Sequence, residues 1–156
     1  MSEDARQPLA HMQAQLVGAL VEGVPMPAGF DRERLAAVAE ALRSKRARAV
    51  ARAWPQSARA AGDAFAARFA EYARANPLPG DSSPLADGRA FVAWLERAGL
   101  LTDAARLEAF AFDARHRLRK GRVTARRGPG LRVLRLRRRL VVVIRLPFVG
   151  ERWLLR

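Results

Sequence analysis

The sequence contains no cysteine and has only two histidines, His11 and His116, among its 156 residues. Without cysteine, the chain can form no disulfide, thiolate zinc site, iron–sulfur cluster or cysteine nucleophile. Neither histidine has a second histidine at the spacing typical of metal ligands. We therefore expect this chain to hold no metal and no cofactor, and the lack of cysteine suits a reducing cytoplasm.

Signatures of common enzyme classes are also missing. The sequence has no Gly-x-Ser-x-Gly elbow, no phosphate-binding P-loop and no dinucleotide fingerprint. Its carboxylates are scattered and mostly lie beside arginines, although a catalytic pair could still form in three dimensions. We predict that the protein is not an enzyme, and an independent enzyme is the least favoured alternative.

Long apolar runs are absent. The two most apolar stretches, residues 16–24 and 140–146, are far shorter than the roughly 20 residues needed to span a bilayer. The first residues include Ser2, Glu3 and Asp4 and lack the cationic and apolar regions of a secretory signal. These features predict a cytoplasmic protein that does not engage a membrane.

Acidic residues are nearly absent from the last 43 residues. Residues 114–156 contain 15 Arg or Lys against Glu151 alone, which equals the net charge of +14 of the whole chain. Residues 1–113 contain 14 basic and 14 acidic residues and are therefore neutral. Such a one-sided charge asymmetry usually indicates an anionic partner.

Helical periodicity covers the neutral part of the chain. Apolar residues recur every three or four positions in residues 9–21 and 32–54, and Asp31 is placed to cap the second helix. A short helical turn follows Pro55. The further helices predicted are one with Phe65, Phe69 and Tyr72, one over residues 85–98, and one that Thr102 caps and that extends to Leu118. The apolar stripe of the 32–54 helix consists of Leu35, Val38, Leu42 and Val50.

The period changes near Arg119, where glycines begin to punctuate segments rich in Val, Leu and Arg. This pattern predicts short antiparallel strands at residues 122–126, 131–137 and 140–146. Both faces of the last strand are largely apolar, so either it is buried on both sides or one face packs on the helices and the other on a partner. The alternation slips between Val133 and Leu134, which predicts a bulge.

These patterns predict an α+β fold, with about five helices in a bundle over residues 1–118 and a small antiparallel β-sheet in a basic segment over residues 119–156. Arginine binds carboxylates and phosphates through paired hydrogen bonds, so the partner is an acidic peptide or nucleic acid. The candidate partner-binding residues are Arg132, Arg135, Arg137, Arg138, Arg139, Arg145, Phe148 and Trp153.

A peptide is favoured over nucleic acid as the partner. Two aromatic residues, Phe148 and Trp153, are few for a single-strand stacking surface, and the charged region lacks a recognition helix for duplex DNA. An arginine-bearing strand edge suits peptide capture by strand addition. A DNA-binding transcriptional regulator is the alternative.

The middle of the chain resembles a known group of proteins. The matching elements are Trp54-Pro55, Gly62, Phe65, Phe69, Tyr72, Asn76-Pro77, Asp87-Gly88, Phe91, Leu95 and residues 105–108, Ala-Arg-Leu-Glu. In this order they are similar to the helical domain of partner proteins of multinuclear non-haem iron-dependent oxidases, a domain that has also been labelled DNA-binding.

The resemblance implies a non-catalytic adaptor in the biosynthesis of a ribosomally made, post-translationally modified peptide. Such a protein binds the iron oxidase and the leader region of an acidic precursor peptide, while the oxidase holds the iron. The family often has a Tyr-Arg-x-Asn run before the aromatic-Pro element, and this chain has Leu42-Arg43-Ser44-Lys45-Arg46 in its place. No leader-contacting residue is therefore transferred from the family.

Overall fold

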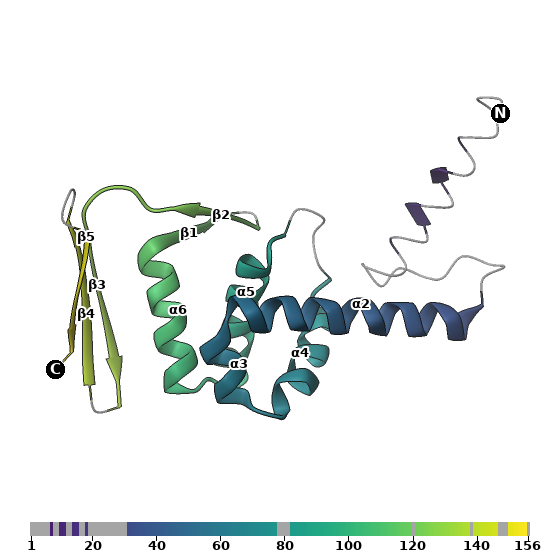
Figure 1. The fold of residues 1–156 in the computed structure, drawn as a ribbon, viewed down its shortest axis with the longest axis horizontal. Coiled ribbons are helices and arrows are strands. Elements are labelled where there is room, and N and C mark those ends of the chain that lie inside the picture. Colours follow the sequence, from purple (N-terminus) through teal and green to yellow (C-terminus); the bar gives the residue numbers. More distant parts are fainter. Residues whose placement is uncertain are drawn as a thin grey trace. The chain divides into compact units, whose positions relative to one another are not determined.

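The protein is described by a computed structural model in which residues 7, 10, 11, 14, 15, 18, 31–77, 82–119, 121–137, 139–146 and 150–155 are placed. Within these residues, five helices are followed by five short strands, which confirms the α+β class (Figure 1). The helix predicted for residues 9–21 lies mostly outside the described residues. No helix in the described ranges is long and apolar enough to cross a membrane.

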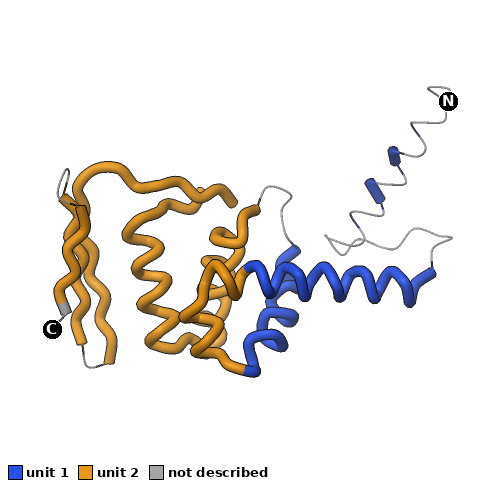
Figure 2. Tube along the Cα trace, viewed as in Figure 1, with its two compact units in different colours: residues 1–49, 63–80 blue, residues 50–62, 81–156 orange. Residues whose placement is uncertain are grey.

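The chain divides into two compact units, of which the first comprises residues 1–49 and 63–80 and the second residues 50–62 and 81–156 (Figure 2). All five strands belong to the second unit, together with three of the helices. The predicted domain boundary at residue 118 stays a prediction.

The first unit contains most of α2, which runs from Arg32 to Ala53 and closely matches the prediction. Asp31 caps this helix, because its Oδ1 accepts hydrogen bonds from the backbone N–H groups of Glu33 (3.0 Å) and Arg34 (3.3 Å). The predicted apolar stripe is wrong in its middle, since the side chains of Val38 and Leu42 are 44% and 40% exposed.

Helix α4, Ala64–Ala75, buries the predicted aromatic face of Phe65, Phe69 and Tyr72. The guanidinium of Arg46 lies 5.5 Å from the ring centre of Phe69 and 5.4 Å from that of Tyr72. It also donates a hydrogen bond to the carbonyl oxygen of Asn76 at 3.0 Å. Arg46 therefore stabilises the aromatic cluster of α4 through cation–π contacts.

The second unit contains α3 (Pro55–Ala61), α5 (Pro84–Arg97) and α6 (Asp103–Arg115). Thr102 caps α6 as predicted, because its hydroxyl accepts from the N–H of Ala105 at 3.2 Å. The predicted end of α6 at Leu118 is wrong. Residues His116–Arg119 form strand β1, since they pair with β2, Arg122–Ala125, in a hairpin that turns at Gly121 (φ +77°).

Trp54 joins helices α5 and α6 of this unit. Its Nε1 donates to the carbonyl oxygen of Leu85 (3.2 Å), and its ring centre lies 5.1 Å from that of Phe112. The indole also lies directly over the backbone of Gly88, where a Cβ atom would overlap Cδ1, Nε1 and Cγ of the ring. Gly88 therefore permits the close approach of Trp54 to α5.

Glu108, from α6, caps the start of α3. Its carboxylate accepts hydrogen bonds from the backbone N–H groups of Gln56 (3.0 Å) and Ser57 (2.7 Å) and from the Ser57 hydroxyl (2.7 Å). Free N–H groups and the helix dipole both favour negative charge at a helix N-terminus. Glu108 thus fixes α3 to α6.

Strands β3 (Gly130–Leu136), β4 (Arg139–Leu146) and β5 (Gly150–Leu155) form an antiparallel sheet with β4 in the centre. Strands β2, β3 and β4 confirm the sequence prediction, whereas β1 and β5 were not predicted. The predicted bulge is wrong, because every residue of β3 from Gly130 to Leu136 pairs with β4 without interruption. The slip in alternation instead puts apolar residues on both faces of β3.

One face of this sheet packs against α6 (Figure 1). Val141 and Val143 of β4 are 0% and 2% exposed and form a core with Phe110 and Ala114 of α6. The partly buried residues around them are Leu107, Leu134, Leu136 and Trp153. The three-stranded sheet and α6 therefore form two layers packed around a shared core.

We expect Gly88→Ala to lower the free energy of unfolding by roughly 1–3 kcal/mol, because the added methyl group would displace the buried Trp54 indole. Helix propensity alone predicts the opposite sign, a gain of about 1 kcal/mol. Urea unfolding followed by tryptophan fluorescence and circular dichroism measures the difference. Ala90→Gly, at an exposed position of α5, is the control for propensity, and a more stable Gly88→Ala protein would contradict the overlap.

Candidate partner-binding surface

The second face of the β3–β4–β5 sheet is apolar and points away from the core formed with α6. Paired residues of neighbouring strands share a face, so this outer face follows from the strand register. Its rows are Leu131–Ile144–Arg152, Val133–Val142–Leu154 and Arg135–Leu140, with Leu146–Gly150 at one end. We call this set of residues the outer face.

Side chains of the outer face are far more exposed than an ordinary sheet core. Leu131 is 66% exposed, Val133 56% and Leu154 55%. Leu140 and Leu146 are 40% and 45% exposed. Contiguous exposed apolar side chains of this kind usually mark a surface that binds another protein or ligand. The predicted burial of β4 on both sides is therefore wrong, and the packing of one face on α6 is confirmed; a partner on the other face stays a prediction.

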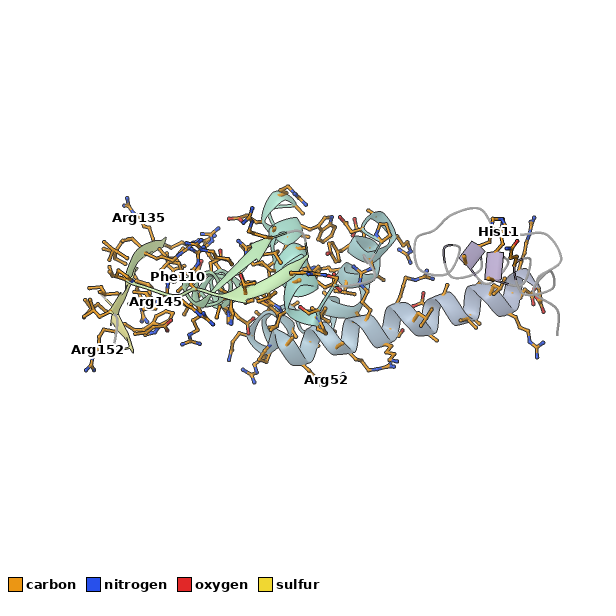
Figure 3. The ribbon with its side chains drawn as sticks, turned by 90° about the horizontal axis from the view of Figure 1, so that it is seen from above. His11, Arg52, Phe110, Arg135, Arg145 and Arg152 are labelled. Atoms are coloured by element: carbon orange, nitrogen blue, oxygen red, sulfur yellow. The ribbon has the colours of Figure 1, made fainter. Side chains whose placement is uncertain are left out.

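Two arginines stand at diagonal corners of the outer face. Arg135 on β3 pairs with Leu140, and Arg152 on β5 pairs with Ile144. Both side chains are exposed and extend away from the sheet (Figure 3). The described residues of the outer face include no acidic side chain. The surface is thus apolar in its middle and basic at its corners.

The turn between β3 and β4 gathers the exposed arginines of the predicted site. Arg135, Arg137 and Arg139 are all exposed and lie at this end of the sheet. Arg138 and Phe148, also predicted to bind a partner, lie outside the described residues. The three exposed guanidinium groups can engage carboxylates or phosphates.

Three other predicted site residues make contacts inside the unit. Arg132 donates to the carbonyl oxygen of Asp113 (3.1 Å), and Arg145 donates to that of Arg126 (2.9 Å). Trp153 packs edge-to-face on Phe110, with ring centres 6.1 Å apart. These contacts favour a structural role for Arg132, Arg145 and Trp153, and their assignment to the binding site stays a prediction.

A network of charged residues connects α5, α6 and the sheet. Arg89 donates two hydrogen bonds of 2.9 Å to the carboxylate of Asp113, and these bonds raise the pKa of Arg89. Arg132 lies 3.8 Å from the same carboxylate, and Arg115 pairs with Glu151 at 2.9 Å. In this network the carboxylates of Asp113 and Glu151 hold arginines of the helices and strands in place.

Arg126 lies close to this network and has a less favourable environment. Desolvation by its surroundings lowers the pKa of Arg126, and the charges of Arg117, Arg132 and Arg145 lower it as well. Its Nε donates to the carbonyl oxygen of His116 at 2.9 Å. Arginine keeps its charge despite such shifts, so the hairpin end of this unit carries concentrated positive charge.

The sequence-based reasoning missed Arg152, Leu131, Val133 and Leu154 as site residues. Their signal was present in the alternation of residues 131–136 and 150–155, where every second position belongs to the outer face. It was hidden because the inner positions of the same strands, apart from Glu151, are also apolar or arginine. Within the described residues, no three His, Asp or Glu side chains are grouped so that they could hold a metal ion.

Fold and surface together define a small α+β protein in which a helix supports one face of a sheet and leaves the other face open. The chain matches the family described as "SCO6045-like, C-terminal domain" over residues 10–97. It therefore belongs to this family. The matched segment includes Trp54 and Gly88, which form the close contact of the indole with α5.

A relative from Streptomyces avermitilis, named "UPF0276 protein", is 36% identical over 147 residues. The alignment covers 90% of this chain but 28% of the relative. The relative therefore contains a segment similar to this chain within a much longer polypeptide. No solved structure matches the chain.

Two valine-to-alanine substitutions, compared by their effect on the free energy of unfolding, test whether the outer face is exposed to solvent in the isolated protein. We expect Val141→Ala to lower the free energy of unfolding by about 2 kcal/mol, because Val141 is fully buried against α6. We expect Val133→Ala, on the neighbouring strand but 56% exposed, to change it by no more than about 0.5 kcal/mol. Urea denaturation measures both values, and equal losses would mean that the outer face is covered in solution.

Proposed function

We propose that this protein is a non-catalytic adaptor that binds a peptide-modifying, multinuclear iron-dependent oxidase and its acidic precursor peptide. The observation that carries the proposal is the three-stranded sheet, which combines an exposed apolar face with an arginine-bearing edge strand. Its support from the sequence is the resemblance of residues 9–115 to partner proteins of such oxidases. In this assignment the oxidase performs the chemistry and the adaptor supplies binding surfaces.

Strand β3 is the edge best suited to the precursor peptide. Among the described strands it pairs with β4 alone, so the backbone groups along its other side are available for a further strand. An extended peptide can add to such an edge through main-chain hydrogen bonds, and alternate side chains then provide specificity. Arg135 and Arg137 at the end of β3 favour a peptide with carboxylates near the β3–β4 turn.

The long relative adds support of a different kind. A segment similar to this chain makes up about a quarter of that polypeptide, since the alignment covers 28% of it. A domain joined to a larger protein part acts at a high effective concentration beside it. This arrangement is consistent with an adaptor that works next to a larger partner.

We expect replacement of Arg135, Arg137 and Arg139 by Glu to weaken precursor binding by at least about 30-fold, because three carboxylate contacts become repulsive. Isothermal titration calorimetry with the precursor peptide measures the affinity. The control is the triple change of Arg52, Arg74 and Arg97 to Glu, which alters the net charge equally at exposed helix positions. Unchanged binding by the first variant would remove these arginines from the binding site.

A DNA-binding regulator remains the second candidate, favoured by the exposed arginines of the β1–β2 hairpin region, Arg117, Arg119, Arg122 and Arg127. A regulator would lose affinity for its operator steeply with salt and would prefer one sequence over others. For an adaptor, we expect fluorescence anisotropy to give equal affinities for unrelated duplexes at every salt concentration. A sequence preference of 1,000-fold or more would favour the regulator.

A further inference from the structure

We propose that the outer face of the β3–β4–β5 sheet is the surface that binds the oxidase, and that a precursor strand added to β3 extends this same face toward the enzyme. The inference rests on the proposed adaptor function and assigns its two partners to different parts of one sheet. The partner surface would be an apolar patch on the folded oxidase, bordered by carboxylates.

The shape of the outer face suits a folded protein better than an extended peptide. Its apolar side chains come from all three strands, with Val133, Val142 and Leu154 side by side in one row. The backbones beneath them are hydrogen-bonded to one another, and the opposite face is fixed by the core with α6. A rigid apolar area of this kind matches the hydrophobic centre of a protein–protein interface.

The charges around the outer face define the chemistry of its partner. Arg135 and Arg152 are its charged residues among the described positions, and both are exposed. Interfaces favour arginine at their edges, where it pairs with carboxylates of the partner. A second copy of this chain would bring like charges to the corners of the contact, so the surface favours an acidic partner over self-association.

Peptide addition at β3 connects the two binding events. A new antiparallel strand beside β3 would place every second side chain on the outer face, in line with Leu131 and Val133. The other side chains would point to the opposite side of the sheet. An enzyme bound to the outer face would therefore contact every second side chain of the precursor. This contact would orient the peptide before any chemistry occurs.

The test separates enzyme binding from peptide binding. Leu146→Glu combined with Leu154→Glu places two carboxylates on the outer face, on β4 and β5 and away from the β3 edge, at side chains that are 45% and 55% exposed. We expect this variant to lose at least about 30-fold in affinity for the full-length partner oxidase. Its affinity for the free precursor peptide is expected to stay within about threefold, because neither substitution lies on β3.

The matched control is Leu100→Glu combined with Leu118→Glu. These two leucines are each 39% exposed and lie outside the β3–β4–β5 sheet, and the double substitution alters the net charge by the same amount. Binding of both partners is expected to be unchanged. Circular dichroism verifies the fold of each variant, and Leu146→Gln with Leu154→Gln serves as a neutral second variant if the Glu pair unfolds. For this milder pair we expect a loss of about tenfold in oxidase affinity.

Three results would overturn the inference. Unchanged oxidase binding by a folded outer-face variant would exclude this surface. A dimeric wild-type protein that the same variant converts to a monomer, without loss of oxidase binding, would assign the outer face to self-association. A wild-type protein that binds the precursor but no oxidase would remove the enzyme as the occupant, whereas binding of neither partner would refute the adaptor function itself.

Discussion

Burial of α6 on two opposite sides is the constraint on which the second unit depends. Residues two apart on an α-helix point in nearly opposite directions. Phe112 therefore faces Trp54 and His116, while Phe110 faces Trp153 and the sheet. Because one helix provides both contacts, the position of the sheet follows from the packing of the helices.

Local signals in the sequence were sufficient to predict most helices and three strands. The caps at Asp31 and Thr102 and the break at Pro55 depend on backbone chemistry that adjacent residues determine. The end of α6 could not be predicted in this way. His116 and Leu118 continue a helical pattern, but their pairing with Ala125 and Val123 in a hairpin outweighs that preference.

The candidate surface was harder to predict than the fold because its residues share their chemistry with the core. Val133 and Val141 are both valines and lie on neighbouring strands, yet Val133 is 56% exposed and Val141 is 0% exposed. The face on which each lies is set by strand register and by the position of α6, neither of which is encoded near the residue itself. The same limit applies to Arg135 and Arg132, one exposed and the other held by Asp113.

Net charge is consequently a poor guide to how strongly the C-terminal segment attracts an anionic partner. Arg115, Arg132 and Arg145 are held by Glu151 or by backbone carbonyl oxygens within the unit. Their positive charge still adds to the long-range field, which governs encounter rates. Short-range affinity depends instead on guanidinium groups that remain exposed, such as Arg135 and Arg152 beside the apolar outer face. For the proposed adaptor, specific recognition therefore depends on a few positions rather than on the total charge of +14.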